Sequence, residues 1–197
     1  MTQTQQILTI AAEKGLLSGA DLKTYGIPGS LLNRLHAEGR LVKVARGIYS
    51  LPDHDIDSHL DLAIASKRYP HGIIALLSAL AFHGLTTQSP HQVWMAVRYG
   101  KMPRLRNRGI RFVTMSGEAF DAGVETHVIE GVPVKITCPA KTVADCFKFR
   151  NRIGLDVALE AYQDFERQEG DMEALWRYAK IDRVDGVMRP YLVGMGT

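Results

Sequence analysis

The sequence lacks the features that are typical of secreted, disulfide-bonded or membrane-embedded proteins. Cys138 and Cys146 are its only cysteines, so no disulfide framework is predicted. No apolar run approaches the roughly 20 residues that a membrane-spanning helix needs. The first residues, MTQTQQILTIAAEKG, have no basic flank ahead of an apolar run, unlike a secretory signal. We therefore expect a cytoplasmic protein with no membrane partner.

Motifs of enzymes and metalloproteins are also missing. There is no P-loop, no GxGxxG and no nucleophile elbow. Two cysteines eight residues apart form no CxxC pair, and the histidines show no recurrent ligand spacing such as HExxH. His83, followed by Gly84, is expected to end a helix, where its imidazole can meet free carbonyls. We expect no catalytic residue, no metal and no cofactor. The histidines considered are His54, His59, His71, His83 and His91.

The sequence contains enough apolar residues for a hydrophobic core, and its charged residues are unevenly distributed. Hydrophobic residues make up 46% of 197 residues, which suits one large or two small domains. Residues 1–52 hold six basic and three acidic side chains, and residues 98–111 hold six basic and none acidic. Residues 53–97 and 112–197 are both net acidic. Positive charge is therefore concentrated in two segments, which favours a polyanionic partner.

The first of these segments contains a helix with one polar face. Gly26 suits the left-handed end of a short helix, and Pro28 suits the start of a second that runs to Gly39. Leucines recur on one side of this second helix. Ser30, Asn33, Arg34 and Ala37 share the other side at i, i+3, i+4 and i+7. Such a face can enter a major groove, where Arg pairs with guanine and Asn with adenine.

A β-hairpin is predicted directly after this helix. Residues 41–44 and 48–51 are β-prone, and Gly47 suits the positive-φ position of the short loop between them. Lys43 then lies on a strand and Arg46 at the tip, where phosphates or a narrow minor groove can be reached. Helix, turn, helix and basic hairpin together predict a winged helix-turn-helix that binds DNA. An amphipathic helix and hairpin with merely solvated charges is the alternative.

The rest of the chain predicts an α+β class, with a mixed α+β C-terminal domain after the N-terminal winged helix-turn-helix. We expect domains at 1–52 and 57–197, joined by a polar junction at 52–57. Within this scheme Trp94 and Trp176 are expected in the core. The predicted helices are 2–14, 57–69, 72–83, 139–150, 155–167 and 172–181, and the predicted strands are 92–97, 110–114, 126–130 and 132–137.

The second basic segment follows a predicted strand and contains Gly100, Pro103 and Gly109, so it is expected to be a loop or ribbon. Its charges could contact DNA phosphates or an acidic protein surface, and the sequence does not separate the two. A solvated loop is the third possibility. The residues of this segment, the second basic patch, are Arg98, Lys101, Arg104, Arg106, Arg108 and Arg111.

The segment GIPGSLLNRLHAEGRLVKVARGIYSLP, ending at Pro52, resembles the N-terminal domain of AbiEi-type antitoxins. Residues 70–94 and 137–162 resemble the core of the C-terminal domain of this family. One departure is Gly29, where family members often have a basic residue that would contact a phosphate. The resemblance implies a transcriptional autorepressor that counters a nucleotidyltransferase-like toxin in a type IV toxin–antitoxin system.

Two further function classes stay open at this point. Asp121, Glu125, Glu130 and Lys135 lie near β-prone segments, as acids and a lysine do in many metal-dependent nucleases. No compact acid–x–Lys unit appears among them, so the resemblance to a nuclease is weak. The third class is a winged helix that contacts only protein. For the regulator we expect an operator of inverted-repeat type, bound by a homodimer or by two monomers.

Overall fold

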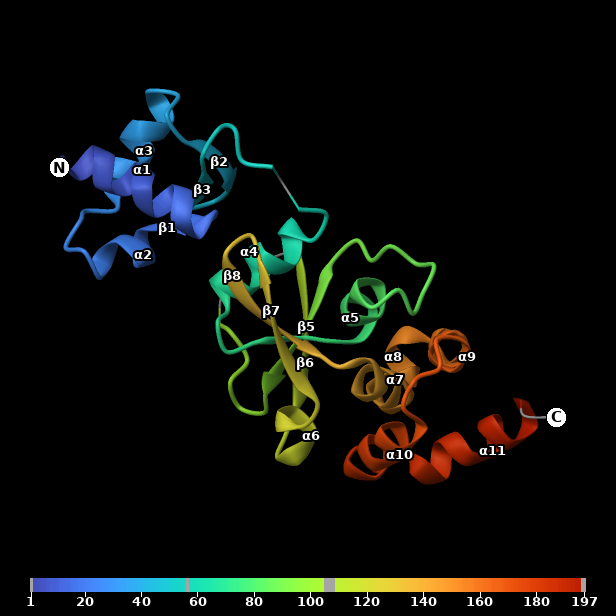
Figure 1. Cartoon of the computed structure of the whole chain (residues 1–197). Coiled ribbons are helices and arrows are strands. Elements are labelled where there is room, and N and C mark those ends of the chain that lie inside the picture. The colour runs from blue at the N-terminus through green and yellow to red at the C-terminus, as the bar shows by residue number, and fades with distance from the viewer. Residues whose placement is uncertain (1, 56, 105–108, 196–197) are drawn as a thin grey trace. The chain divides into compact units, whose positions relative to one another are not determined.

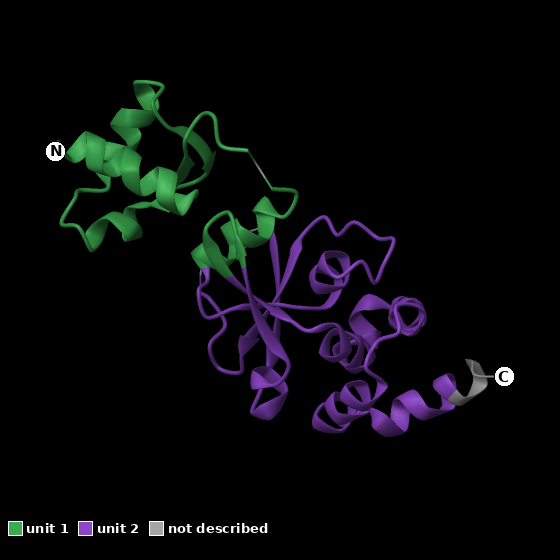
Figure 2. Cartoon of the chain, in the orientation of Figure 1, with its two compact units in different colours: residues 1–68, 128–133 green, residues 69–127, 134–197 purple. Residues whose placement is uncertain are grey.

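The computed structural model describes residues 2–55, 57–104 and 109–195, which form two units (Figure 2). The N-terminal unit comprises residues 1–68 together with residues 128–133, and the C-terminal unit comprises the remainder. Each unit has its own hydrophobic core, and the described residues form two β-sheets. The protein is therefore mixed α+β, with helices and two sheets, as its sequence predicts at the level of class.

Within the described part of residues 1–68, the N-terminal unit has four helices and three short strands (Figure 1). A capping box starts the first helix, since Thr2 and Gln5 satisfy each other's backbone N–H groups. Gly26, at φ +66°, separates α2 from α3 in the left-handed conformation expected there. In chain order the elements are α1 Gln3–Lys14, β1 Leu17–Ser18, α2 Gly19–Lys23, α3 Ser30–Ala37, β2 Val42–Ala45, β3 Ile48–Ser50 and α4 Leu60–Arg68.

The small sheet of this unit has the strand order β1-β3-β2, antiparallel throughout. The two-residue loop Arg46–Gly47 connects β2 to β3, and Gly47 adopts φ +74° as predicted. Lys43 pairs with Tyr49 across the ribbon. The register shifts between Lys43 and Ala45, and such a bulge increases the local twist of a ribbon. Apolar residues from α1, α2, α3 and the sheet fill one core beneath these elements.

The C-terminal unit contains seven α-helices and most of a five-stranded sheet within the described residues, since residues 128–133 at the β7–β8 turn are counted with the N-terminal unit. The strand order is β6-β5-β4-β8-β7, and β5 and β6 are parallel although they are consecutive in the chain. The elements are β4 Ile73–Ile74, α5 Leu76–Phe82, β5 Val93–Arg98, β6 Ile110–Met115, α6 Glu118–Asp121, β7 Val124–Ile129, β8 Val132–Thr137, α7 Pro139–Lys148, α8 Arg150–Ile153, α9 Leu155–Arg167, α10 Met172–Ile181 and α11 Asp185–Met195.

Helix α7 is the centre of the C-terminal unit, because it contacts α5, α9 and α10 (Figure 1). Eight of its residues are buried, among them Lys141 and Asp145. Lys141 donates to Asp145, one turn away, and to Asp182 after α10, at 3.1 and 3.3 Å. Lys148 donates to the same Asp182 at 3.3 Å. We call these four residues the buried charge cluster. Its members Lys141, Asp145 and Asp182 have fully or almost fully buried side chains.

Most of the predicted elements are confirmed, some with shifted ends. The predicted helix 72–83 is wrong in its first part, because Ile73 and Ile74 form the central strand β4 between β5 and β8. Helix α3 is two residues shorter at each end than predicted. Glu130 lies in the β7–β8 turn, so strand 126–130 is shifted to 124–129. Trp94 is buried and Trp176 packs against the core as expected. The elements β1, α6, α8 and α11 were not predicted.

Among the described residues, no helix combines the length and the apolar character that crossing a membrane requires.

Candidate nucleic-acid interface

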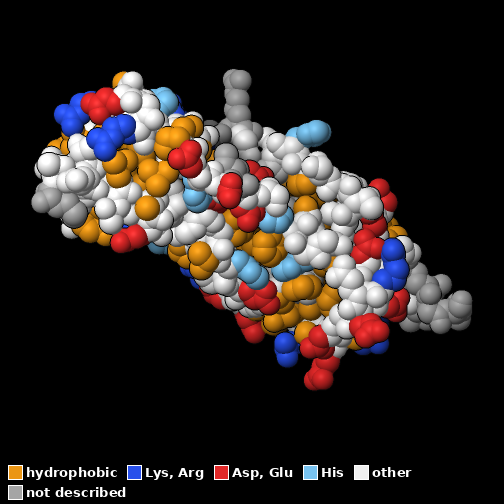
Figure 3. Space-filling model, turned by 45° about the horizontal axis from the view of Figure 1, so that its top comes forward, with side chains coloured by type: hydrophobic (Ala, Val, Ile, Leu, Met, Phe, Trp, Pro, Cys, Tyr) orange, Lys and Arg blue, Asp and Glu red, His pale blue; other side chains and the backbone are white. Residues whose placement is uncertain are grey.

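The outward face of α3 is the polar stripe that its periodicity predicts. Ser30, Asn33, Arg34 and Ala37 are exposed, whereas Leu32 and Leu35 are buried in the N-terminal core. Ser30 is the first helical residue after Gly29. Lysine and arginine side chains gather on the surface of this unit, together with a carboxylate (Figure 3). The helix therefore presents small and hydrogen-bonding groups to solvent over two turns.

A tyrosine of the hairpin fixes one of these side chains. The Tyr49 hydroxyl donates to Asn33 Oδ1 at 2.6 Å, and Tyr49 itself is only 3% exposed. Because the amide oxygen accepts this hydrogen bond, the Nδ2 group keeps its two donor hydrogens for another partner. Tyr49 was not among the predicted site residues. The sequence could have indicated Tyr49 only by its residue type, because the hydroxyl of a tyrosine at a buried strand position usually has a hydrogen-bond partner.

Arg34 has a competing partner on its own helix. Its Nε lies 3.5 Å from Glu38 Oε1, and both side chains are about half exposed. An exposed pair at this i,i+4 spacing is worth only about 0.3–0.5 kcal/mol. The pair therefore orients the guanidinium along the helix without withholding it from a stronger acceptor.

The hairpin adds cations beside the helix. Lys43 on β2 and Arg46 in the loop are both exposed, as predicted. The Asn33–Tyr49 hydrogen bond ties α3 to β3, and Lys43 is the cross-strand neighbour of Tyr49. Arg40, between α3 and β2, is a further exposed cation that was not among the predicted site residues. The predicted residues of the helix and the hairpin thus belong to adjoining elements of one unit.

The second basic patch is the connection between the parallel strands β5 and β6, together with the strand residues at its ends. Two of its cations stack on aromatic rings: the Arg98 guanidinium lies 4.8 Å from the Phe120 ring centroid and that of Arg111 lies 4.5 Å from Trp94. Arg98 also pairs with Asp121. Lys101 and Arg104 are exposed, and Arg106 and Arg108 lie outside the described residues.

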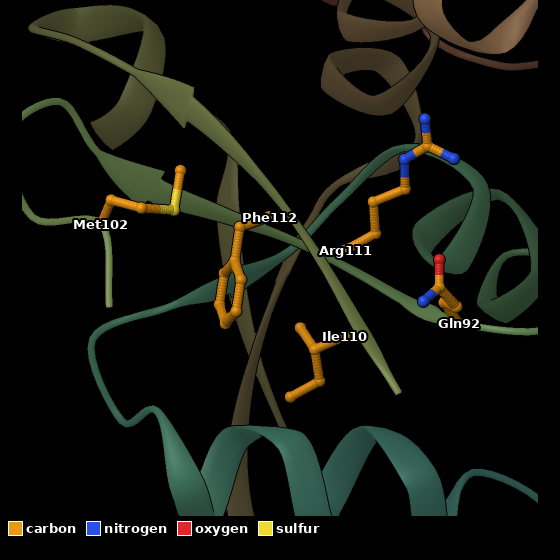
Figure 4. A pocket seen from close by; sticks show the side chains of 5 residues that line it. All are labelled: Gln92, Met102, Ile110, Arg111 and Phe112. Atoms are coloured by element: carbon orange, nitrogen blue, oxygen red, sulfur yellow. The ribbon is translucent and has the colours of Figure 1, made fainter. Parts of the chain in front are cut away.

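A pocket of about 290 Å³ lies beside this connection, lined by Gln92, Met102, Ile110, Arg111 and Phe112. Figure 4 shows Arg111 pointing to the side of β6 opposite to Ile110 and Phe112, as alternation along a strand requires. The pocket thus has a polar part at Gln92 and Arg111 and an apolar part at the other three residues. Arg98 and Arg111 of the second basic patch therefore have aromatic partners, whereas Lys101 and Arg104 are exposed.

The carboxylates of the nuclease hypothesis have partners of other kinds. Asp121 pairs with Arg98, Glu125 with His127, and Glu130 with His54. Glu130 also accepts the backbone N–H of Asp57, and Lys135 is exposed on β8. In the part of the chain that the structure describes, no three His, Cys, Asp or Glu side chains are grouped to hold a metal ion.

His83 ends α5, as predicted, and its ring meets a carbonyl that belongs to another segment. Its Nε2 lies 2.8 Å from the carbonyl oxygen of Thr137. Burial lowers the pKa of His83, because the charged imidazolium is disfavoured away from water. Cys146 is fully buried, and burial raises the pKa of its thiol well above the usual value. Both side chains therefore favour their neutral forms.

Residues 5–52 match the model of a family described as transcriptional regulators, AbiEi antitoxin. The resemblance of the N-terminal segment to this family is thereby confirmed, and the other two segments lie outside the match. The crystal structure of the RV2827C protein from Mycobacterium tuberculosis is similar, with a TM-score of 0.53 and 16% sequence identity over 93% of this chain and 76% of that chain. At this identity the likeness concerns the fold alone. No curated protein sequence matches the chain significantly.

Proposed function

We propose that the chain is a DNA-binding transcriptional repressor of the AbiEi antitoxin type. In this proposal residues 1–52 form a winged helix-turn-helix domain and residues 57–197 an α+β antitoxin domain. The observation that supports it most is the joined pair of elements: an exposed polar face on α3, linked through Asn33 and Tyr49 to a hairpin with exposed cations. The family match over residues 5–52 supports the same conclusion.

The residues have different roles in recognition. Ser30, Asn33 and Arg34 contact base edges in the major groove, with Asn33 donating to a base acceptor and Arg34 to guanine. Lys43 and Arg46 contact phosphates or the adjacent minor groove and supply affinity without sequence preference. The operator is an inverted repeat bound by a homodimer or two monomers, since each winged helix covers one half-site.

The biological role in this proposal is the one that the family resemblance implies. The chain represses its own operon in the cytoplasm and counters a cognate nucleotidyltransferase-like toxin, a separate protein. It is not an enzyme in this proposal, and it needs no metal or cofactor. The second basic patch, residues Arg98–Arg111, then meets either flanking DNA or an acidic surface of the toxin.

A mobility-shift titration with duplex DNA from upstream of the gene tests the proposal. We expect saturable binding whose affinity falls steeply between 50 and 200 mM salt, because phosphate contacts release counterions. Affinity that does not change with salt, or no preference over a scrambled duplex, would contradict DNA recognition and favour a protein-binding winged helix. Incubation with plasmid and Mg²⁺ or Mn²⁺ addresses the nuclease alternative, for which cleavage would be required.

Tyr49→Phe tests the role assigned to Asn33. Loss of the hydroxyl removes the hydrogen bond to Asn33 Oδ1 and lets the amide rotate, at a cost of about 1 kcal/mol in stability. We expect discrimination at one operator base pair to fall by roughly 1–3 kcal/mol while binding to unrelated duplex is unchanged. A panel of operators with single base-pair changes measures this. Tyr25→Phe, an exposed tyrosine of the same unit, is the control. An equal loss on every duplex would contradict the assignment.

A further inference from the structure

The C-terminal unit contains a cationic pocket that the DNA-binding surface does not use. It has a volume of about 480 Å³ and lies between the Ser116–Ala119 segment, the end of α7 and the end of α10. Three of its lining side chains are basic, Lys148, Lys180 and Arg183, and the one acidic lining side chain is that of Glu118. Ser116 adds a hydroxyl. The volume of the pocket is within the range of about 300–1,000 Å³ that is typical of small-molecule sites.

Arg183, which lines the pocket, is one of four non-glycine residues at positive φ in the described part of the chain. Helix α10 ends in a Schellman motif, in which Val184 N–H donates to Ala179 O at 2.8 Å and Arg183 N–H to Lys180 O at 3.0 Å. The left-handed residue of this motif is normally glycine, yet here it is an arginine at φ +59°. The adjacent residue Asp182 is buried, whereas Arg183 lines the pocket. The sequence thus has a long cation at a position where backbone geometry alone favours glycine, and such outliers cluster at functional sites.

The buried charge cluster does not neutralise the positive charge of the pocket. Asp182 accepts from both Lys141 and Lys148, so one carboxylate is shared by two ammonium groups. The other buried acid, Asp145, accepts a hydrogen bond from Lys141, so the buried charge cluster holds two acids and two lysines. Lys180 and Arg183 are both exposed. Lys148, Lys180 and Arg183 together therefore exceed Glu118 in charge at the pocket.

We propose that this pocket binds a small phosphate-bearing ligand, with Lys180 and Arg183 on its phosphate oxygens and Lys148 at its base. Lysine and arginine are the usual phosphate partners, and an arginine can contact two oxygens at once. Ser116 can donate a further hydrogen bond to the same group. The polar lining favours a compact polyanion over an apolar ligand. This proposal does not depend on DNA binding by the N-terminal unit.

Calorimetric titration of the full chain with inorganic phosphate, pyrophosphate and a nucleoside triphosphate, in a phosphate-free buffer of low ionic strength, tests it. We expect saturable binding of pyrophosphate that Arg183→Gly weakens at least tenfold and Lys180→Gln weakens measurably. Arg177→Gln removes a cation from the same helix outside the pocket and is expected to leave the affinity unchanged. Equal affinity for pyrophosphate and the triphosphate indicates that the phosphate group alone is recognised, and tighter triphosphate binding indicates a nucleotide.

Arg183→Gly is also a fair test of folding, since glycine suits the left-handed position better than arginine does. Thermal unfolding followed by tryptophan fluorescence reports on this unit, because Trp94 and Trp176 both belong to it. We expect Arg183→Gly to unfold at the same or a higher temperature. The proposal is overturned if no probe binds saturably, or if Arg183→Gly and Arg177→Gln behave alike. It is equally overturned if Arg183→Gly weakens operator binding while no phosphate probe binds, because the pocket is then part of a DNA surface.

Discussion

The double substitution Arg34→Ala and Arg46→Ala should remove most operator-specific binding. Arg34 is assigned to a base edge, and losing such a contact costs about 1–3 kcal/mol, or roughly 5-fold to 150-fold in affinity. Arg46 is assigned to the backbone or minor groove, so its loss should lower affinity on every duplex and reduce the salt slope by about 1. Mobility shifts with operator and scrambled duplexes at several salt concentrations separate the two contributions.

The single variants make this prediction sharper. Arg34→Lys keeps the charge but not the bidentate geometry, so it should lose specificity while non-specific affinity is kept. Glu38→Gln releases Arg34 from its helical partner and should slightly raise affinity. Arg167→Ala, an exposed arginine of the C-terminal unit that pairs with Asp164, is the control and should change nothing. If the double variant binds the operator as tightly as the original chain, the assignment of α3 and the hairpin is wrong.

How far the sequence predicts this site depends on how local each feature is. The polar stripe on α3 follows from a helical period, and the positive φ of Gly26 and Gly47 follows from residue type, so both could be predicted. The hydrogen bond between Asn33 and Tyr49 joins residues sixteen positions apart. No local pattern specifies that contact, since it depends on how the hairpin folds back on the helix. The sequence therefore predicts Asn33 as a candidate site residue but not Tyr49, whose hydroxyl orients it.

The same limit explains the errors in the C-terminal unit. Ile73 and Ile74 continue an apolar run that has helical character, but they pair with β5 and β8, which are distant in the chain. Tertiary pairing outweighs local propensity there. The second basic patch was predicted from charge alone, and its partners Trp94, Phe120 and Asp121 lie elsewhere in the sequence. No sequence pattern predicted the pairing of Lys141 with Asp182, which lie forty-one residues apart.

Lys141→Met is expected to lower the stability of the C-terminal unit by about 3–5 kcal/mol at neutral pH. Lys141 is fully buried and is the cation between Asp145 and Asp182, so its removal leaves two buried carboxylates with one partly exposed lysine, Lys148. Leaving buried charge without its partner has this cost, whereas methionine keeps most of the side-chain volume. Urea unfolding followed by tryptophan fluorescence measures it, since both tryptophans belong to this unit. Lys135→Met, at an exposed position on β8, should stay within about 0.5 kcal/mol of the original.

The pH dependence gives this prediction a signature that simple loss of packing would not have. Burial raises the pKa of Asp145 above its unfolded value, so the folded state binds more protons and this group favours folding as pH falls. Removing Lys141 raises the pKa of Asp145 further, because a neighbouring positive charge is lost. The difference in unfolding free energy between the variant and the original chain should therefore shrink as the pH falls from 8 to 5. In the original chain, burial opposes the charge of Lys141, but Asp145 and Asp182 outweigh it and raise the pKa. Its stabilisation is therefore complete below the unfolded pKa and lost only in strong alkali. A variant as stable as the original at pH 7, or a deficit that does not vary with pH, would mean that the cluster contributes no net electrostatic stability.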